Sequence, residues 1–102
     1  MRIDVVGRNI EVTDAIRQYA ESRGAKLPRF FDGVQQVIVT LTQTNAHHTT
    51  AFNAEFVVEA EKHKPFVSNA ESPDLYAAID LSVEKTERQL RDFKERLKKS
   101  HH

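Results

Sequence analysis

The sequence predicts an α+β fold with the element order βαβββα, in which two helices pack on one face of a four-stranded sheet. Three observations predict this fold. Residues 50–60 alternate apolar and polar side chains, which is the period of a strand with one buried face. Residues 79–97 repeat apolar side chains at steps of four and three, which is the period of a long amphipathic helix. Residues 13–27 form a shorter segment of the same helical kind.

The first strand and the first helix follow from the N-terminal residues. Residues 2–6 alternate enough for a strand, and Gly7-Arg8-Asn9 is typical of a turn before Ile10-Glu11-Val12. We expect Thr13 to cap the first helix, because its hydroxyl can accept a hydrogen bond from a free amide of the first turn. Pro28 marks the exit of this helix. The apolar side of the helix is expected to consist of Ala15, Ile16, Tyr19, Ala20 and Leu27.

Three further strands are expected in the middle of the chain. The turn Phe31-Asp32-Gly33 leads into the β-branched segment 36–42, and residues 45–48 form a hairpin loop before the alternating strand. The turn Lys62-His63-Lys64 then precedes a last strand over residues 66–70. The core face of the alternating strand is expected to consist of Phe52, Ala54, Phe56, Val58 and Ala60.

The second helix has a clear predicted start. Ser72 is expected to be its N-cap, Pro73 its first residue, and Asp74 an acid that complements the positive end of the helix dipole. Tyr76 and Phe93 are expected in the core and not as platforms for stacked bases. The apolar side comprises Ile79, Val83, Leu90, Phe93 and Leu97, with Thr86 in the one polar position.

The outer side of this helix is basic, and two interpretations of it stay open. Lys85, Arg88, Arg96 and Lys99 project roughly opposite the apolar side, interrupted by Asp92. The side chains could bind a polyanion, or they could form a solvated surface of acid–base pairs at four-residue steps.

Length and composition limit the protein classes. A chain of 102 residues with 39% hydrophobic content is expected to form one domain over residues 1–99, and residues 100–102 a tail such as an expression tag leaves. The absence of cysteine excludes disulfides and thiolate metal sites. No apolar segment reaches the roughly 18 residues that span a bilayer, and no signal-peptide pattern is present. We therefore expect a cytoplasmic protein without a membrane partner.

Charge is balanced in total but segregated along the chain. Fifteen basic and fifteen acidic side chains cancel, unlike those of the usual strongly basic nucleic-acid module. Residues 1–30 carry six basic and four acidic side chains, residues 31–81 carry two and seven, and residues 82–102 carry seven and four. This asymmetry predicts a polar interaction surface.

The acidic middle segment predicts which face a polyanion avoids. Glu55, Glu59 and Glu61 are expected on the open face of the sheet, where they would repel phosphate. RNA is therefore expected to dock on the helix side. Base stacking on the sheet is not expected, because Phe52 and Phe56 face the core.

Catalytic and metal sites are not expected. No serine lies in a nucleophile elbow, and no glycine-rich loop follows a strand. His47 and His48 are loop neighbours without a third ligand, and Glu59, Glu61 and His63 are expected on a solvated strand face. The sequence thus predicts no enzyme activity, no cofactor, no metal ion and no small-molecule substrate.

Several short motifs occur in a defined order over residues 2–99. They are Gly7, Ile10-Glu11-Val12-Thr13-Asp14-Ala15-Ile16-Arg17, Ala25-Lys26-Leu27, Phe31-Asp32, Val37-Ile38-Val39, and Asp74-Leu75-Tyr76-Ala77-Ala78-Ile79-Asp80 with Lys85, Glu87, Arg88, Gln89 and Leu90. In order and spacing they resemble the short form of the ribosome hibernation promoting factors. That family includes the ribosome-associated inhibitor A of bacteria and is also described as the sigma-54 modulation proteins.

The resemblance implies the same βαβββα fold and a translation-inhibiting factor of stress and stationary phase. Such a factor binds ribosomal RNA of the small ribosomal subunit in the channel for messenger and transfer RNA, and stabilises inactive ribosomes or paired ribosomes. By position, the residues expected to contact ribosomal RNA are Arg23, Lys26, Arg29, Lys85, Arg88 and Arg91, with Lys94 and Lys98 as further candidates. Gly24, Pro28 and Asp92 depart from the pattern of relatives.

Two other functions are compatible with the residues. The order helix, three strands and helix also describes a free double-stranded RNA-binding domain, although Ser72-Pro73-Asp74 is acidic where that module is basic. The acidic sheet face could instead serve a protein-interaction or regulatory module.

Overall fold

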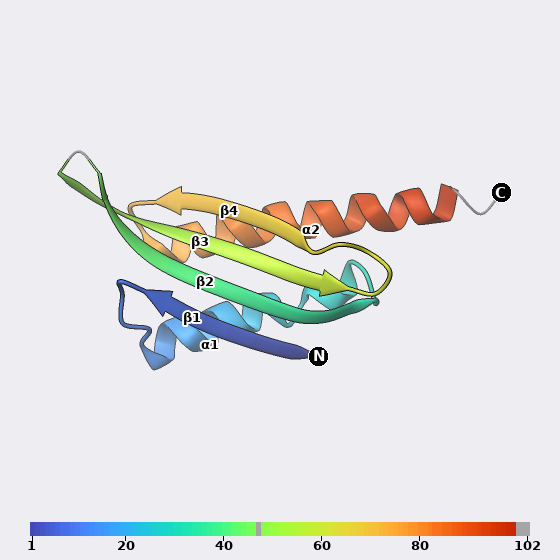
Figure 1. The fold of residues 1–102 in the computed structure, drawn as a ribbon, viewed down its shortest axis with the longest axis horizontal. Helices are drawn as coiled ribbons and strands as arrows, with labels where there is room; N and C mark the ends of the chain where they lie inside the picture. The colour runs from blue at the N-terminus through green and yellow to red at the C-terminus, as the bar shows by residue number, and fades with distance from the viewer. Residues whose placement is uncertain (47, 100–102) are drawn as a thin grey trace.

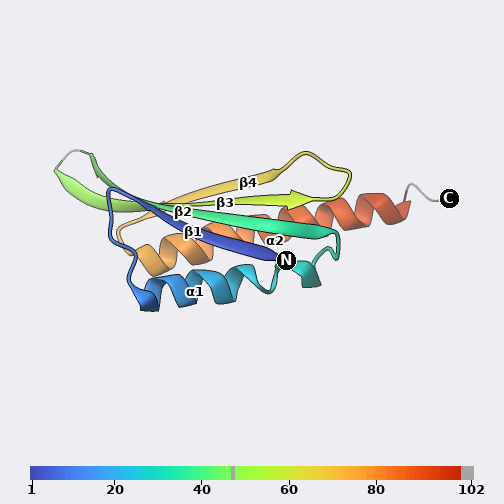
Figure 2. The ribbon, with the colours of Figure 1, turned by 60° about the horizontal axis from the view of Figure 1, so that its bottom comes forward.

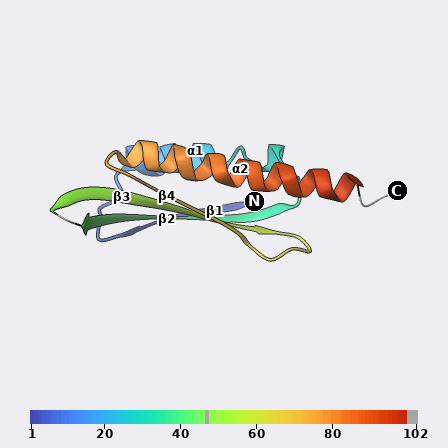
Figure 3. The same ribbon diagram turned by 90° about the horizontal axis from the view of Figure 1, so that it is seen from above.

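The computed structural model describes residues 1–46 and 48–99 as two layers, a four-stranded sheet and two helices that cover one of its faces (Figures 1 and 3). The sheet order is β1-β2-β3-β4, with β1 parallel to β2 and the other neighbours antiparallel. The elements in chain order are β1 (Arg2–Arg8), α1 (Asp14–Gly24), the short 3-10 helix η1 (Leu27–Arg29), β2 (Val34–Ala46), β3 (Thr49–Ala60), β4 (Phe66–Ser72) and α2 (Leu75–Lys99). The predicted βαβββα order is confirmed.

The core lies between the sheet and the helices. The alternation predicted for β3 is confirmed, since Ala54, Phe56, Val58 and Ala60 are buried and Phe52 is partly buried. Each fully buried Val, Leu, Ile or Phe side chain contributes about 1.5–3 kcal/mol of hydrophobic stabilisation. The partners of this face on β2 and α2 include Val37, Val39, Leu41, Ile79, Val83 and Leu90, all fully buried.

The polar position on the apolar side of α2 has a structural explanation. Thr86 is fully buried, and its hydroxyl donates to the carbonyl oxygen of Ser82 at 3.3 Å. A buried hydroxyl with a hydrogen-bond partner avoids the desolvation penalty of an unpaired one. The helix therefore keeps a continuous buried side, as predicted.

The cap of α1 is confirmed, whereas its exit differs from the prediction. The Thr13 hydroxyl accepts a hydrogen bond from the amide of Ile16 at 3.2 Å. The helix ends at Gly24, and Leu27 is buried from the following η1. Ala15, expected on the apolar side, is exposed. Consecutive residues of a helix are rotated by about 100° around its axis, so Ala15 and Ile16 lie on different sides of α1.

The turn after β1 begins later than predicted. Gly7 and Arg8 belong to the strand and pair with β2, and the chain turns at Asn9, whose φ is 58°. Asparagine tolerates this left-handed conformation better than most residues. A glycine is required at position 7 by the lack of space for a side chain and not by a turn. A Cβ atom there would lie 2.6 Å from Val12 Cγ2 and 2.8 Å from the carbonyl oxygen of Ile10.

The start of α2 also lies further along the chain than predicted. Ser72 is the last residue of β4, where it pairs with Phe52. Asp74 takes the capping role, because its Oδ1 accepts from the amide of Tyr76 at 3.2 Å and its carbonyl accepts from the amide of Ala78 at 3.0 Å. The Ser72 hydroxyl instead accepts from the amide of Asp74 at 3.2 Å.

One flank of α2 lies against β4, an outer strand of the sheet. Three side chains of the helix donate to carbonyl oxygens of that strand. They are Ser82 Oγ to Ser68 at 3.2 Å, Lys85 Nζ to Asn69 at 2.7 Å and Gln89 Nε2 to Val67 at 3.2 Å. The last part of α2 extends past the end of the sheet (Figure 2).

Candidate nucleic-acid interface

The two layers of the protein carry opposite net charge. Residues 14–29, which span α1 and η1, hold four basic and two acidic side chains, and α2 holds seven and five. The four strands together hold two basic side chains and four acidic ones. A polyanion is therefore attracted to the helix layer and repelled by the sheet, as the segregation along the sequence predicts.

Arg23 lies between the helices and is engaged within the protein. Its Nη1 forms an ion pair with Asp80 Oδ1 at 3.1 Å, and its side chain is only 25% exposed. The same carboxylate oxygen accepts a hydrogen bond of 2.5 Å from the Tyr19 hydroxyl. This hydrogen bond, followed by burial and the charge of Asp80, raises the pKa of Tyr19 above its ordinary value of 10.0. The geometry assigns Arg23 to the contact between α1 and α2.

Lys26 and Arg29 lie at the exit of the first helix, and both are exposed. Lys26 is the N-cap of η1 and Arg29 is its last residue, and this spacing of three residues places their side chains on one side of a 3-10 helix. Arg91 of α2 reaches the same region, since its guanidinium lies 5.8 Å from the ring centroid of Phe30. Neither Lys26 nor Arg29 has an ion pair within residues 1–46 and 48–99. We call Lys26, Arg29 and Arg91 the exit cluster.

Lys85 and Arg88 continue from Arg91 around the outside of α2. The three residues follow one another at steps of three, each about 60° from the next around the helix axis. They therefore form a band from the flank against β4 to the flank near η1. Lys85 Nζ donates to the carbonyl oxygen of Asn69, whereas Arg88 is exposed and has no partner among the residues described.

Two further basic residues of α2 lie beside the exit cluster. Lys94 and Lys98 follow Arg91 at three and seven residues, so they lie on the same side of α2, and both are exposed. The family resemblance implied them only as further candidates. The structure makes Lys94 and Lys98 stronger candidates, because they share a side of α2 with Arg91, and Arg91 lies over Phe30 beside Lys26 and Arg29. That contact joins segments far apart in the chain.

Tyr76 and Phe93 differ in their environments. The prediction of a core position is wrong for Tyr76, which is 39% exposed and meets the Tyr19 ring edge-on at 5.0 Å. Phe93 packs against the core as predicted, with its ring edge-on to Phe31 at 5.2 Å. Tyr76 lies one turn before Asp80 on the helix, which explains its place on the flank facing α1.

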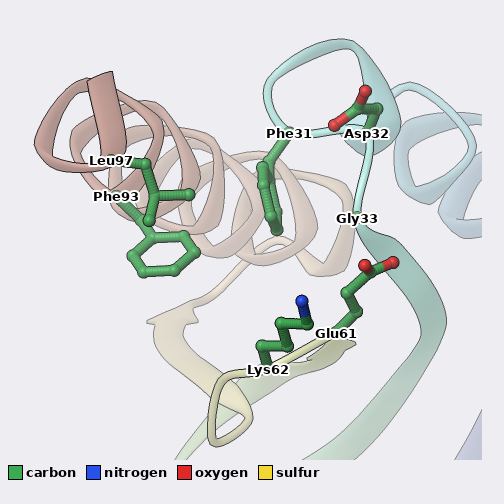
Figure 4. A pocket seen from close by; sticks show the side chains of 7 residues that line it. All are labelled: Phe31, Asp32, Gly33, Glu61, Lys62, Phe93 and Leu97. Carbon is green, nitrogen blue, oxygen red and sulfur yellow. The ribbon is translucent and has the colours of Figure 1, made fainter. Parts of the chain in front are cut away.

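A cavity of about 400 Å³ opens beside the C-terminal part of α2 (Figure 4). It is lined by Phe31, Asp32, Gly33, Glu61, Lys62, Phe93 and Leu97. Glu61 was expected on the open face of the sheet, and this prediction is wrong because β3 ends at Ala60. A lining of two carboxylates, one lysine and apolar side chains does not suit a phosphate.

The histidines do not assemble a metal site in the described part of the chain. His63 stacks on the ring of Phe66 at 4.3 Å and does not join Glu59 and Glu61. No group of three potential ligands lies close enough to hold a metal ion there. His47 of the predicted histidine pair, and the tail over residues 100–102, lie outside the described residues.

Comparison with known proteins identifies the family. Residues 3–98 match the family described as Sigma 54 modulation protein / S30EA ribosomal protein. The chain belongs to this family. The resemblance predicted from the sequence motifs is thereby confirmed.

Individual S30EA relatives are similar over nearly the whole chain. The ribosome hibernation promoting factor of Escherichia coli strain K12 is 37% identical over 98 residues, which cover 96% of this chain and 98% of the relative. The factor of the same name from Azotobacter vinelandii is 36% identical over 99 residues, covering 94% and 85%.

Solved structures show the same fold. A ribosomal subunit interface protein from Coxiella burnetii superposes with a TM-score of 0.78 at 22% identity, covering 93% of this chain and 99% of that one. The N-terminal domain of Thermus thermophilus Protein Y superposes with a TM-score of 0.73 at 35% identity, covering 91% and 99%. None of the described helices of this S30EA-family chain is both long and apolar enough for a membrane span.

Proposed function

We propose that this S30EA-family protein is a non-enzymatic hibernation factor that binds ribosomal RNA of the small subunit in the channel for messenger and transfer RNA. Occupation of that channel blocks translation and keeps idle ribosomes inactive, in the cytoplasm where ribosomes reside. The observation that carries the proposal is the basic helix layer opposite an acidic sheet, in a chain similar to named ribosome hibernation promoting factors.

The contacts are proposed to be made to phosphates and to the shape of the folded RNA. Exposed lysine and arginine side chains bind phosphate oxygens without reading base sequence. The proposed contact residues are Lys26, Arg29, Arg88 and Arg91, with Lys94 and Lys98 extending the surface along α2. Lys85 contributes charge at the edge of this surface, and Arg23 acts from inside by holding the helices together.

Sedimentation with vacant ribosomes through a sucrose gradient, at low and at high salt, tests this proposal. We expect the protein to migrate with the small subunit at low salt and to dissociate as salt rises, because each phosphate contact releases counterions. Association that does not respond to salt, or no association at either salt, contradicts it. The same gradient reports whether ribosome pairs accumulate, which we include in the proposal.

A charge reversal locates the contact surface. The double variant Lys26→Glu with Arg88→Glu should lose co-sedimentation while keeping its unfolding temperature, since both side chains are exposed and unpaired within the described residues. Arg88 is a cleaner choice than Lys85, whose substitution would also remove the hydrogen bond to Asn69. Unchanged co-sedimentation of this variant would contradict the site.

A further inference from the structure

The open face of the sheet, away from the helices, carries a row of aliphatic side chains. Ile38, Val57 and Val67 lie directly opposite one another on β2, β3 and β4. Their chain neighbours on these strands are buried in the core, so these three point the other way. Val67 is 48% exposed. On β1 the residue opposite Ile38 is Asp4, so the aliphatic side chains end at β2. We call Ile38, Val57 and Val67 the aliphatic row.

Two unpaired carboxylates flank this row on its central strand. Glu55 and Glu59 lie two residues before and two residues after Val57, on the same face of β3. At the rise of a strand their Cα atoms are about 13 Å apart. Within the described chain neither carboxylate has an ion pair or a hydrogen bond, in contrast to Asp4, which pairs with Arg2 at 3.1 Å. The face therefore offers an apolar centre between two free negative charges.

We propose that the open sheet face docks on a basic protein surface, with an aliphatic centre flanked by lysine or arginine, while the helix layer binds RNA. An apolar centre with a charged rim is the usual composition of a protein–protein contact. The carboxylates repel the phosphates of RNA, and a second copy of this chain that docked through the same sheet face would bring the same excess of negative charge. A basic protein complements both the row and its flanks. This inference rests on the proposed ribosome binding and adds a protein component to it.

The direction in which a charge reversal changes the affinity for ribosomes distinguishes the possible partners of the sheet face. The double variant Glu55→Lys with Glu59→Lys should weaken binding to vacant ribosomes by about tenfold, because it sets positive charge against positive charge. The matched control is Glu84→Lys with Glu95→Lys on α2, which changes the net charge equally at two exposed positions of the helix layer. We expect the control to bind more tightly. Stronger binding by the sheet variant, as RNA would give, or unchanged binding, as solvent would give, overturns the inference.

Site-specific photocrosslinking identifies the class of partner. A benzoylphenylalanine would replace either Val67 of the sheet face or Leu81 of α2, two side chains of nearly equal exposure, 48% and 47%. After irradiation on purified ribosomes, position 67 should form an adduct with a protein that survives ribonuclease, and position 81 an adduct with RNA. An adduct of position 67 with RNA or with a second copy, or none, overturns the inference.

The two proposals fail differently. If the unsubstituted chain does not co-sediment with ribosomes at low salt, the proposed function fails, and the docking inference with it. If the chain binds ribosomes but the sheet variant and the position 67 adduct give the contrary results, only the docking inference fails. Equal unfolding temperatures of all variants would show that the fold is retained.

Discussion

The Tyr19 hydroxyl donates a hydrogen bond of 2.5 Å to Asp80 Oδ1, joining α1 to α2. Arg23 forms an ion pair with the same carboxylate oxygen at 3.1 Å. One acidic side chain therefore holds two partners from the first helix. Because η1 follows directly from α1, this contact fixes the position of Lys26 and Arg29 relative to Arg91 of α2.

Removal of the Tyr19 hydroxyl should destabilise the protein. We expect Tyr19→Phe to lower the free energy of unfolding by about 1 kcal/mol, a modest value for a hydrogen bond to a carboxylate because Asp80 is partly exposed. Urea denaturation measures this change in the free energy of unfolding. Tyr76→Phe is the matched control, since the Tyr76 hydroxyl has no hydrogen-bond partner in the described part of the chain. Equal effects of the two variants would contradict the assigned role of the Tyr19–Asp80 contact.

Stability should depend on the ionisation of Tyr19 at alkaline pH. The pKa of Tyr19 is raised in the folded state, first by its hydrogen bond to Asp80, so the unfolded chain loses this proton at lower pH. The contribution is complete below the ordinary pKa of 10.0 and is lost as pH rises toward the folded value. The difference in unfolding free energy between the unsubstituted chain and Tyr19→Phe should therefore shrink above that pH. Because the chain has two tyrosines, absorbance titration of Tyr76→Phe isolates Tyr19.

Substitutions of Arg23 and Lys26 should have different effects, the first on stability and the second on ribosome binding. Arg23→Gln removes the ion pair with Asp80, so we expect a lower free energy of unfolding, by about 0.5–1 kcal/mol, and a nearly unchanged affinity for ribosomes under conditions where the variant is folded. Lys26→Gln should do the opposite, with unchanged stability and weaker binding. Chemical denaturation and sedimentation read the two effects. A loss of affinity from Arg23→Gln as large as that from Lys26→Gln would indicate that Arg23 contacts RNA directly.

The salt dependence of binding should report the contact of Arg88. Arg88→Gln should reduce the slope of log affinity against log salt by about 0.7–0.9, the value for one phosphate contact. Lys64→Gln is the control, because it removes one exposed charge from the turn between β3 and β4, at a position that is not among the proposed contact residues. Equal slopes for Arg88→Gln and the unsubstituted chain would mean that Arg88 makes no phosphate contact.

Periodic patterns predicted the elements and their buried faces. The alternation on β3 and the four-and-three spacing on α2 each reflect a local geometry that one segment imposes on its own side chains. The Thr13 cap is local in the same sense, since its hydroxyl meets the amide of Ile16 three residues later.

Non-local contacts decided the features that were predicted wrongly. Ser72 is a good capping residue, yet pairing with Phe52 keeps it in β4 and leaves the cap to Asp74. Gly7 is typical of turns, yet its pairing with Leu41 holds it in β1. For the candidate site, the family resemblance implied an RNA contact for Arg23, whereas the ion pair of Arg23 with Asp80 was not predicted because the two residues are remote in the chain.

The hydrogen bonds from Lys85 and Gln89 to β4 bear on self-association. An outer strand normally presents free carbonyl oxygens to which a strand of another molecule can add, and such addition leads to aggregation. Here the carbonyl oxygens of Asn69 and Val67 already accept from α2. An incoming strand would have to displace both side chains, so α2 protects this border of the sheet against polymerisation at high protein concentration.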